Sequence, residues 1–376
     1  MKIGYDAKRF FNNFTGLGNY SRFVIDAVSH YYPNNEYFLF SPKSRQHPEI
    51  DHIIERDNVH VIKPGKVGST SFLKSIWRSA GISLNPACRS LNVYHGLSHE
   101  LPYGLSDHIK KVVTIHDLIF IRYPEFYNPI DVAIYKAKVK SACKRADRIV
   151  AISEQTKSDI VDFLQISPDK IEVVYQGCHP IFRQTANEEH KTSVRARYRL
   201  PEKYLLNVGT IESRKNAKQI IEAMALLPKD QQLPLVIVGR ATPYKDEVLA
   251  TVHKHQLDHQ VTFVHGAAFA DLPAIYQMAE VFIYPSLFEG FGIPIVEAIE
   301  SGVPVITSKG SCFSEAGGPS TLYVNVGDYA AQASAISTLI TDHEFRRQVI
   351  SGSRAFIAQF STDKIAAEMF SVYKKL

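Results

Sequence analysis

Residues 281–297 read VFIYPSLFEGFGIPIVE and hold the most informative pattern in the chain. Four apolar residues ending at Tyr284 predict a buried strand, and proline at position 294 is the residue type preferred at the start of a helix. The loop between them contains an acid and two glycines. A strand that passes through such a loop into a helix is the building unit of an open α/β sheet.

Working outward, short apolar runs alternate with longer helical patterns in both directions. This alternation predicts parallel sheets with helices on both faces. The predicted strands are Lys2–Tyr5, Tyr37–Phe40, Val59–Ile62, Asn92–His95, Lys111–Ile115, Arg148–Ile152, Ile171–Tyr175, Tyr204–Val208, Pro234–Val238, Val261–Val264, Val281–Tyr284, Val303–Thr307 and Thr321–Val324.

Residues 183–201 interrupt the alternation, because they are polar, highly charged and end at a proline. They are the best candidate for a linker. The length of 376 residues, at about 150 per domain, suggests two or three domains. We therefore predict an α/β protein of two doubly wound domains, residues 1–190 and 191–360. In such sheets, ligands bind beyond the carboxyl ends of the strands.

Composition bounds the function. With 45% hydrophobic and 22% charged residues, the chain has the composition of a soluble globular protein. The net charge of +5 is too small to indicate nucleic-acid binding. No apolar run approaches the roughly 18 residues of a spanning helix, and no signal peptide precedes the first strand, so we expect a cytoplasmic protein. Widely spaced cysteines predict reduced thiols rather than zinc ligands or disulfides, at Cys88, Cys143, Cys178 and Cys312.

Two acids eight residues apart frame the opening motif. Glu289 lies in the loop, where its carboxylate can face a ligand, and Glu297 falls on the first helical turn. Gly290 and Gly292 would expose backbone N–H groups at the helix start. Pairs of acids at this spacing arise by chance, but the E-G-F-G-x-P frame favours a shared site over two unrelated surface acids.

Residues 209–216, GTIESRKN, lead from another predicted strand into a helix. Arg214 and Lys215 stand near a helix N-terminus, where acids are preferred. Cationic side chains in that position are candidates for binding an anion, since arginine and lysine both bind phosphate. A solvated Arg-Lys pair is the alternative.

The first half carries two weaker signals. Residues 15–20, TGLGNY, precede a helix expected near Tyr20, and Gly16 and Gly18 could let the backbone approach a phosphate. Serine at the third glycine position and a long gap after the strand disfavour a nicotinamide site, which leaves an anion-binding loop or a plain turn. His116, directly after a strand, is in a functional position, although single histidines are often structural.

Residues 58–99 contain basic residues and no acid. Apolar and basic residues at near-helical spacing there predict contact with an anionic membrane or an acidic acceptor, against a solvated helix face that packs inward. The basic residues are Lys63, Lys66, Lys74, Arg78 and Arg89. The chain has no D-x-D, no G-x-x-x-x-G-K-[ST] and no G-x-S-x-G motif, so ATP hydrolysis and serine hydrolysis have no support.

Together these motifs resemble the retaining glycosyltransferases of family 4, which have the GT-B architecture of two Rossmann-like domains facing across a cleft. E-G-F-G-I-P-I-V-E at 289–297 is similar to the E-x7-E signature of the family, and 209–216 matches in order and position. Two departures stand out. Thr210 occupies a position where many members have arginine, and Thr362 stands where a tryptophan is common.

The resemblance implies a nucleotide-sugar donor bound mainly by the second domain. Glu297 would bind the ribose, Arg214 and Lys215 the diphosphate, and Glu289 the sugar. His116 would lie against the sugar on the acceptor side, and the nucleotide base would stack near Val264. The remaining implied donor-site residues are Gly16, Gly18, Gly209, Thr210, Gly290, Phe291, Gly292 and Ile293. No metal or other cofactor is expected, and the final helix, residues 361–376, would cross back onto the first domain.

The expected activity is transfer of a hexose from a nucleotide sugar to a glycan or lipid-linked glycan, in surface polysaccharide or lipopolysaccharide synthesis. The R-K-N sequence resembles members that use GDP-mannose. The alternatives are a GT-B nucleotide-sugar epimerase or phosphorylase, or a non-catalytic sugar-nucleotide-binding protein. No nucleic-acid partner is expected, while peripheral association with the inner face of the cell membrane is.

Overall fold

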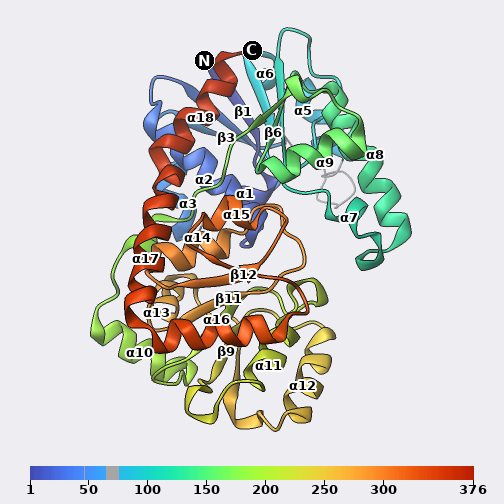
Figure 1. Ribbon diagram of the computed structural model, residues 1–376. Coiled ribbons are helices and arrows are strands. Elements are labelled where there is room, and N and C mark those ends of the chain that lie inside the picture. Colours follow the sequence, from blue (N-terminus) through green and yellow to red (C-terminus); the bar gives the residue numbers. More distant parts are fainter. Residues whose placement is uncertain (46, 65–75) are drawn as a thin grey trace. The chain divides into compact units, whose positions relative to one another are not determined.

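The computed structural model describes residues 1–45, 47–64 and 76–376, and it forms two compact units. The first unit comprises Met1–Gly177 and Phe360–Leu376, and the second comprises Cys178–Gln359 (Figure 1). The division therefore lies ahead of the boundary expected at residues 190 and 191. Every predicted strand is present, with bounds that differ by one or two residues at most of them.

The first unit is built on a parallel sheet with the strand order β3-β2-β1-β4-β5-β6-β7. The strands are β1 (Lys2–Asp6), β2 (Glu36–Phe40), β3 (Val59–Ile62), β4 (Val93–Gly96), β5 (Lys110–Ile115), β6 (Arg148–Ala151) and β7 (Ile171–Val173). From β1, the strands β2 and β3 are added on one side of the sheet, and β4 to β7 are then added on the other side. The loops after β1 and β4 therefore diverge, which opens a crevice at the carboxyl ends of these two strands.

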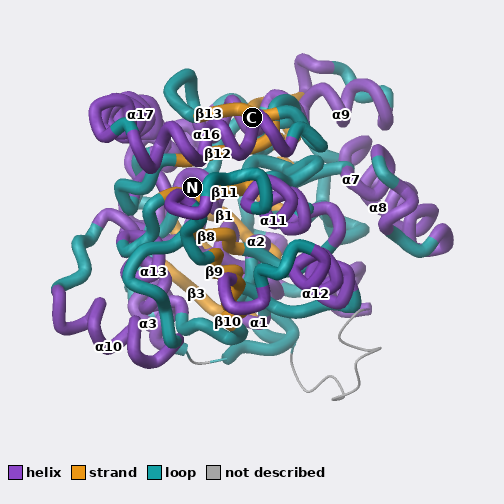
Figure 2. Tube along the Cα trace, turned by 60° about the horizontal axis from the view of Figure 1, so that its bottom comes forward, coloured by secondary structure: helices purple, strands orange, loops and turns teal. Residues whose placement is uncertain are grey.

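Helices pack around the strands of this sheet (Figure 2). In the described part of the unit they are α1 (Lys8–Asn12), α2 (Gly16–Tyr31), α3 (Pro48–Ile54), η1 (Trp77–Gly81), α5 (Ile82–Leu84), α6 (Pro86–Arg89), α7 (Ile119–Arg122), η2 (Pro124–Phe126), α8 (Pro129–Arg145), α9 (Glu154–Leu164), η3 (Pro168–Lys170) and α18 (Thr362–Lys374).

The end of the chain completes the first unit. Helix α18 packs against α2 (Figure 1). The buried hydroxyl of Tyr373 lies 2.7 Å from Nδ1 of His95 and 3.2 Å from the hydroxyl of Tyr5, so α18 is bonded to β4 and β1. The last helix thus belongs to the core of the unit that contains the first strand.

The second unit repeats the same plan in a sheet of order β10-β9-β8-β11-β12-β13, again parallel throughout. The strands are β8 (Leu205–Val208), β9 (Leu235–Val238), β10 (Val261–Val264), β11 (Val281–Tyr284), β12 (Val305–Ser308) and β13 (Leu322–Val324). The direction of growth reverses between β8 and β11, which are neighbours in the middle of the sheet. Their carboxyl ends mark the expected ligand site of this unit.

Among its helices, α11 packs against α12 and α16, α16 packs against α17, and α14 packs against α13, α15 and α17. The helices are η4 (Pro180–Arg183), α10 (Glu188–Tyr198), η5 (Ser213–Lys215), α11 (Ala217–Met224), η6 (Lys229–Gln231), α12 (Tyr244–Lys254), η7 (Asp258–Gln260), η8 (Phe269–Asp271), α13 (Leu272–Gln277), α14 (Ile293–Glu300), α15 (Phe313–Gly317), α16 (Tyr329–Thr341), α17 (His343–Ile357) and η9 (Ala358–Phe360).

Residues 183–201, expected to be a linker, instead contain the whole of helix α10 and its flanks. Nη1 of Arg197 and the hydroxyl of Tyr198 donate hydrogen bonds of 2.6 and 2.7 Å to the carboxylate of Asp271, which precedes α13. The polar composition therefore reflects a solvent-facing helix that is fixed to the second unit by its few inward groups.

All four cysteines are free and buried. Among the helices of residues 1–45, 47–64 and 76–376, none is long and apolar enough to span a membrane.

Candidate active site

The two strongest sequence motifs meet at the strand-order reversal of the second unit. Residues 209–216 follow β8 and residues 285–292 follow β11, and these strands are hydrogen-bonded neighbours. The two loops also touch, because the backbone N–H of Leu287 donates to the carbonyl of Arg214 at 2.8 Å. The sequence motifs therefore form one site.

Glu289 lies at the centre of this site. Its Oε1 atom is 2.8 Å from Nη1 of Arg214 and 2.5 Å from Nζ of Lys215. Arg214 is held further by a 2.6 Å hydrogen bond to the carbonyl of Phe288 and by a 2.7 Å ion pair with Glu212. Two cations thus converge on one carboxylate oxygen.

Tyr284, the last residue of β11, completes the group. Its hydroxyl donates to Oε1 of Glu289 at 3.0 Å and accepts a hydrogen bond from Nζ of Lys215. The main chain of Glu289 is fixed as well, since its carbonyl accepts from Oγ of Ser311 at 3.2 Å and from Sγ of Cys312 at 3.1 Å. Sequence reasoning placed Tyr284 only as the end of a strand, because its contact with Lys215 depends on strand adjacency.

These contacts set the charge of the site. Burial opposes ionisation of Glu289, but Lys215 and Arg214 together lower its pKa to about 2. Burial lowers the pKa of Lys215, an effect that Glu289 partly offsets. For Arg214, Glu289 and Glu212 outweigh burial and raise the pKa. Glu289 is therefore a carboxylate at neutral pH, held between two positively charged groups.

Glu297 has a different environment on the first turns of α14. It is only 9% exposed, and the single hydrogen bond described for its side chain is a 3.0 Å contact from the hydroxyl of Tyr276 to Oε2. Burial raises its pKa to about 7, although the bond from Tyr276 opposes the shift. The two acids of the motif thus differ in charge state near neutral pH.

Glycines shape the backbone around these side chains. Gly209 has φ +152° and Gly292, which caps α14, has φ +102°, conformations that other residues rarely adopt. A Cβ on Gly239 would lie 1.8 Å from the carbonyl oxygen of Gly209, so the loops after β8 and β9 approach closely. Gly290 and Phe291 are buried, and Ile293 begins α14.

Val264 ends β10, with its side chain 4% exposed. Its carbonyl accepts from the N–H of Gly239 at 2.9 Å, and the N–H of Gly209 donates to the carbonyl of Val238 at 2.9 Å. Val264, at the end of β10, and Gly209, directly after β8, therefore lie at the same carboxyl edge of the sheet, on either side of β9. Thr210 follows and is half-buried.

His116 belongs to the first unit, directly after β5. It is 5% exposed, and its Nε2 donates to the carbonyl of Leu97 at 2.9 Å. Burial and the nearby His99 lower its pKa to about 3, so the ring is neutral at physiological pH. The imidazole can therefore contribute a dipole or an Nδ1 acceptor, but no positive charge.

Gly16 and Gly18 lie inside the first turn of α2, which begins at Gly16 and not near Tyr20 as expected. A Cβ on Gly18 would lie 1.7 Å from the carbonyl oxygen of Asn13, whereas a Cβ on Gly16 would meet nothing within 4 Å. Close packing of α2 on the preceding turn thus explains why residue 18 is a glycine. The binding of phosphates by this segment stays a prediction.

The basic segment 58–99 is only partly described, and Lys66 and Lys74 fall outside the described residues. Arg78 is directed inward, in ion pairs with Asp6 at 2.8 Å and Glu100 at 2.6 Å. Arg78 is thus paired with the last residue of β1 and with a residue of the loop after β4. Contact of the segment with a membrane or an acidic acceptor stays a prediction. Apart from residues 46 and 65–75, where nothing is described, no cluster of three or more His, Cys, Asp or Glu side chains could hold a metal ion.

Comparisons with known proteins identify the family. Residues 191–356 match the model of glycosyl transferases group 1, and residues 38–180 match that of glycosyltransferase family 4. The chain is 29% identical over 288 residues to O-antigen chain mannosyltransferase B of Escherichia coli, covering 76% of this chain and 74% of the relative. It is also 29% identical over 272 residues to the serotype-specific mannosyltransferase WbdA of Escherichia coli, covering 70% of this chain but only 33% of that longer protein.

Among solved structures, HepE of Anabaena in complex with UDP-glucose aligns over the full length of both chains, with a TM-score of 0.76 and 16% identity. This likeness confirms the GT-B fold. The chain belongs to the group 1 glycosyltransferases of family 4 and is a glycosyltransferase that uses a nucleotide sugar.

Proposed function

We propose that the protein transfers mannose from GDP-mannose to a glycan or lipid-linked glycan, with retention of configuration and without a metal ion, on the cytoplasmic side of surface polysaccharide synthesis. The observation that carries this proposal is the convergence of Arg214 and Lys215 on Glu289 at the carboxyl ends of β8 and β11. The relatives that are O-antigen and serotype-specific mannosyltransferases support the sugar and the pathway class.

The charges suit the reaction. Departure of a nucleoside diphosphate leaves positive charge on the sugar ring and negative charge on the diphosphate. Arg214 and Lys215 would stabilise the diphosphate, together with the N-terminus of α14, so the residues themselves supply the positive charge that a metal would bring. Glu289, ionised beside them, would stabilise the cationic sugar.

Retention would follow from attack on the face that the diphosphate leaves. The bond from the anomeric carbon to the diphosphate breaks, and a bond from the acceptor oxygen forms on the same face. The acceptor proton passes to a diphosphate oxygen, so the chain needs no separate base. The neutral, buried His116 fits a positioning role better than proton transfer.

The test incubates the protein with GDP-mannose and octyl α-D-mannopyranoside in excess EDTA, and follows GDP release and product by NMR. We expect a disaccharide with the anomeric configuration of the donor. An inverted product would overturn retention, and activity only after addition of a divalent metal would overturn metal independence. In a parallel reaction UDP-glucose replaces GDP-mannose, and transfer from UDP-glucose but not from GDP-mannose would overturn the proposed donor.

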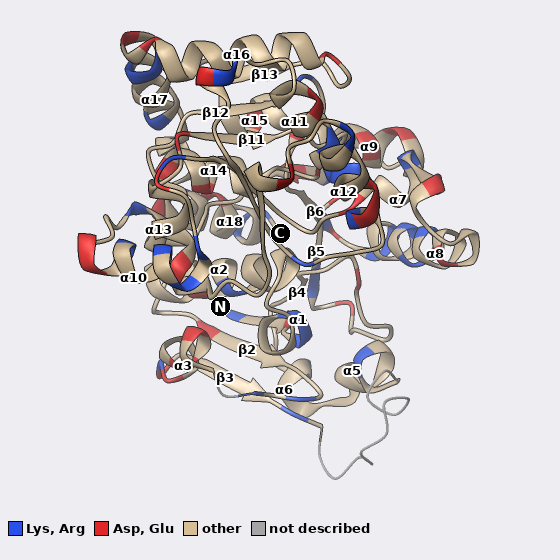
Figure 3. Ribbon diagram, turned by 90° about the horizontal axis from the view of Figure 1, so that it is seen from below, with Lys and Arg blue, Asp and Glu red and all other residues tan. Residues whose placement is uncertain are grey.

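A lipid-linked acceptor would place the protein at a membrane, and helix α8 offers a surface for it. Large apolar side chains are exposed on α8 and the turn before it, at Phe126, Tyr127, Ile130, Ile134 and Tyr135. Lysines follow along α8 (Figure 3), at Lys136, Lys138, Lys140 and Lys144. Exposed apolar groups beside basic ones are typical of binding to anionic lipid surfaces.

Co-sedimentation with phosphatidylglycerol vesicles tests this attachment. Ile134→Asp should reduce binding, while Leu226→Asp, at a similarly exposed apolar site in the second unit, should not. Binding that is equal in both variants, or that does not weaken with added salt, would contradict the role of α8.

A further inference from the structure

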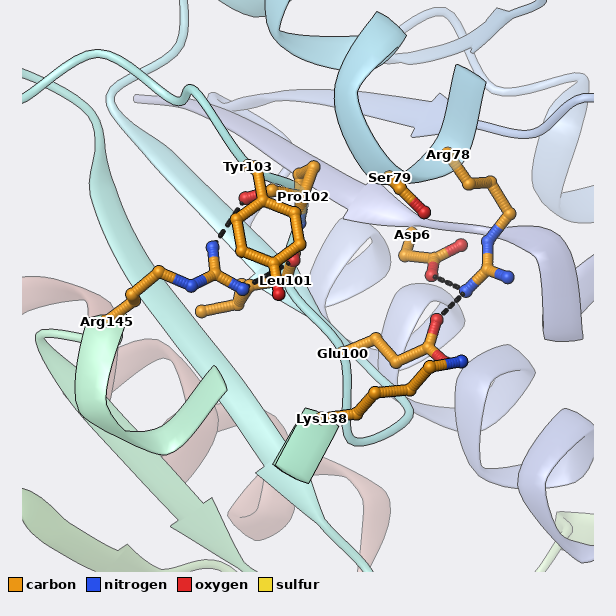
Figure 4. Close-up of a pocket in the computed structure, with 9 residues that line it drawn as sticks. All are labelled: Asp6, Arg78, Ser79, Glu100, Leu101, Pro102, Tyr103, Lys138 and Arg145. Carbon is orange, nitrogen blue, oxygen red and sulfur yellow. Dashed lines mark hydrogen bonds and ion pairs between the residues drawn. The ribbon is translucent and has the colours of Figure 1, made fainter. Parts of the chain in front are cut away.

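A polar pocket of the first unit lies outside every residue discussed as a donor site. It opens at the carboxyl ends of β1 and β4, where the strand order of this sheet reverses. Figure 4 shows its two sides, with Tyr103 and Arg145 on one and Asp6, Arg78, Glu100 and Lys138 on the other. Strand-order reversals are where doubly wound sheets bind ligands, so this pocket is a candidate ligand site.

Two of the three cationic side chains of the pocket, Arg78 and Lys138, are already paired with carboxylates. Nη2 of Arg78 binds Oδ2 of Asp6 at 2.8 Å and Oε2 of Glu100 at 2.6 Å, and Nζ of Lys138 lies 3.9 Å from Oε1 of Glu100. An anionic ligand would have to displace these carboxylates or lie against them. The carboxylate oxygens keep lone pairs beyond those used by Arg78, and so can accept hydrogen bonds from neutral hydroxyl groups.

An aromatic ring forms the opposite side. Tyr103 is 52% exposed, yet its position is fixed, because its N–H donates to the carbonyl of Ser79 at 2.6 Å. The guanidinium of Arg145 lies 4.2 Å from the ring centroid and donates to the carbonyls of Pro102 and Leu101 at 2.7 and 2.8 Å. The ring is therefore presented as a rigid surface at low conformational cost.

A pyranose ring matches both sides of this pocket. Its hydroxyl groups can donate to the carboxylates, and its C–H face can pack on an aromatic ring. We propose that this pocket binds a hexopyranose residue of the acceptor glycan, with Asp6 and Glu100 accepting from its hydroxyls and Tyr103 packing on its ring. The proposal rests on the proposed function, since a transferase needs a second sugar site besides the one at Arg214 and Lys215.

Saturation-transfer NMR on the full chain without any nucleotide sugar tests this site. The probes are the methyl α-glycosides of mannose, glucose, galactose and N-acetylglucosamine. We expect at least one to bind, with Tyr103→Ala weakening that binding about threefold to tenfold. Tyr103→Phe is the matched control, because it keeps the ring and removes only a hydroxyl that lies 3.4 Å from Oγ of Ser141.

A second variant tests the polar side. Asp6→Asn removes the charge that accepts from sugar hydroxyls and should weaken binding about tenfold or more. Because Asp6 also pairs with Arg78, the substitution can lower stability, and the melting temperature of the variant is therefore measured in parallel. If Asp6→Asn does not fold, the comparison of Tyr103→Ala with Tyr103→Phe still tests the site, because Tyr103 is exposed.

The outcomes separate this inference from the donor assignment. Stabilisation of the protein by GDP-mannose, measured by thermal shift, should be the same in wild type, Tyr103→Ala and Tyr103→Phe. A normal donor shift with no glycoside binding, or with binding that Tyr103→Ala leaves unchanged, would overturn the acceptor pocket alone. Binding of inorganic phosphate that depends on Arg145 and Lys138, with no glycoside binding, would identify an anion site instead. Loss of the donor shift with intact glycoside binding would overturn only the donor.

Discussion

Glu289 and Glu297 show how surroundings decide what a carboxyl group can do. Both are 9% exposed, but Glu289 lies against Arg214 and Lys215, while the side chain of Glu297 is described with a single hydrogen bond, from the hydroxyl of Tyr276. The pKa of the first is about 2 and that of the second about 7. Two identical side chains eight residues apart are therefore suited to different tasks, one as a permanent charge and the other as a hydrogen-bonding group that titrates near neutral pH.

Glu297 should make the second unit less stable as the pH rises. Its folded pKa of about 7 lies above the unfolded value near 4.5, so the neutral form favours folding at low pH and this benefit disappears as the pH passes 7. Glu297→Gln, which cannot ionise, should match wild type at pH 4, below the unfolded pKa, and exceed it by up to about 3 kcal/mol at pH 8.5. Urea unfolding at the two pH values measures this, and an equal difference at both would contradict the assigned pKa.

Glu289→Gln should separate binding from transfer. Loss of the carboxylate should lower kcat by about a hundredfold or more, because the sugar cation loses its counter-charge. GDP-mannose should still stabilise the variant, since Arg214 and Lys215 remain. Glu212→Gln is the control, because Glu212 also pairs with Arg214 but is more exposed. Transfer at the wild-type rate in Glu289→Gln would remove Glu289 from the mechanism.

At the scale of elements, the start of α2 depends on one glycine. Gly18→Ala would drive a Cβ into the carbonyl of Asn13, and such overpacking should cost about 1 to 3 kcal/mol in stability. Gly16→Ala, two residues earlier in the same turn and facing open space, is the matched control and should be neutral or slightly stabilising. Thermal unfolding of the two variants distinguishes them. Equal melting temperatures would show that α2 does not pack on Asn13 as described.

The elements themselves were largely readable from the sequence. Buried parallel strands are continuous apolar runs, so β11, which is buried at every residue, was predicted at its observed bounds. Helix α10 was missed because only Val194 on it is buried, and a helix with one inward residue has the composition of a linker. The start of α2 was placed late because glycines at 16 and 18 indicate a loop unless the close contact with Asn13 is known.

At the scale of the whole chain, each unit has one reversal of strand order and a polar group beside it. The group at β8 and β11 was predictable, since its residues lie in two recognisable motifs, although the pairing of Arg214 with Glu289 depends on which strands are neighbours. The pocket at β1 and β4 was not. Asp6, Arg78 and Glu100 come from segments that share no local pattern, and only folding brings them together.

The central claim is that the cations at β8 and β11 bind the diphosphate of a sugar donor. A thermal-shift screen with GDP-mannose, UDP-glucose, ADP-glucose and TDP-glucose tests it most directly, since a ligand that binds only the folded protein raises its melting temperature. We predict stabilisation of wild type by GDP-mannose above the others, and loss of that stabilisation in Lys215→Ala. Equal stabilisation of wild type and Lys215→Ala, or no stabilisation by any of the four, would contradict the account.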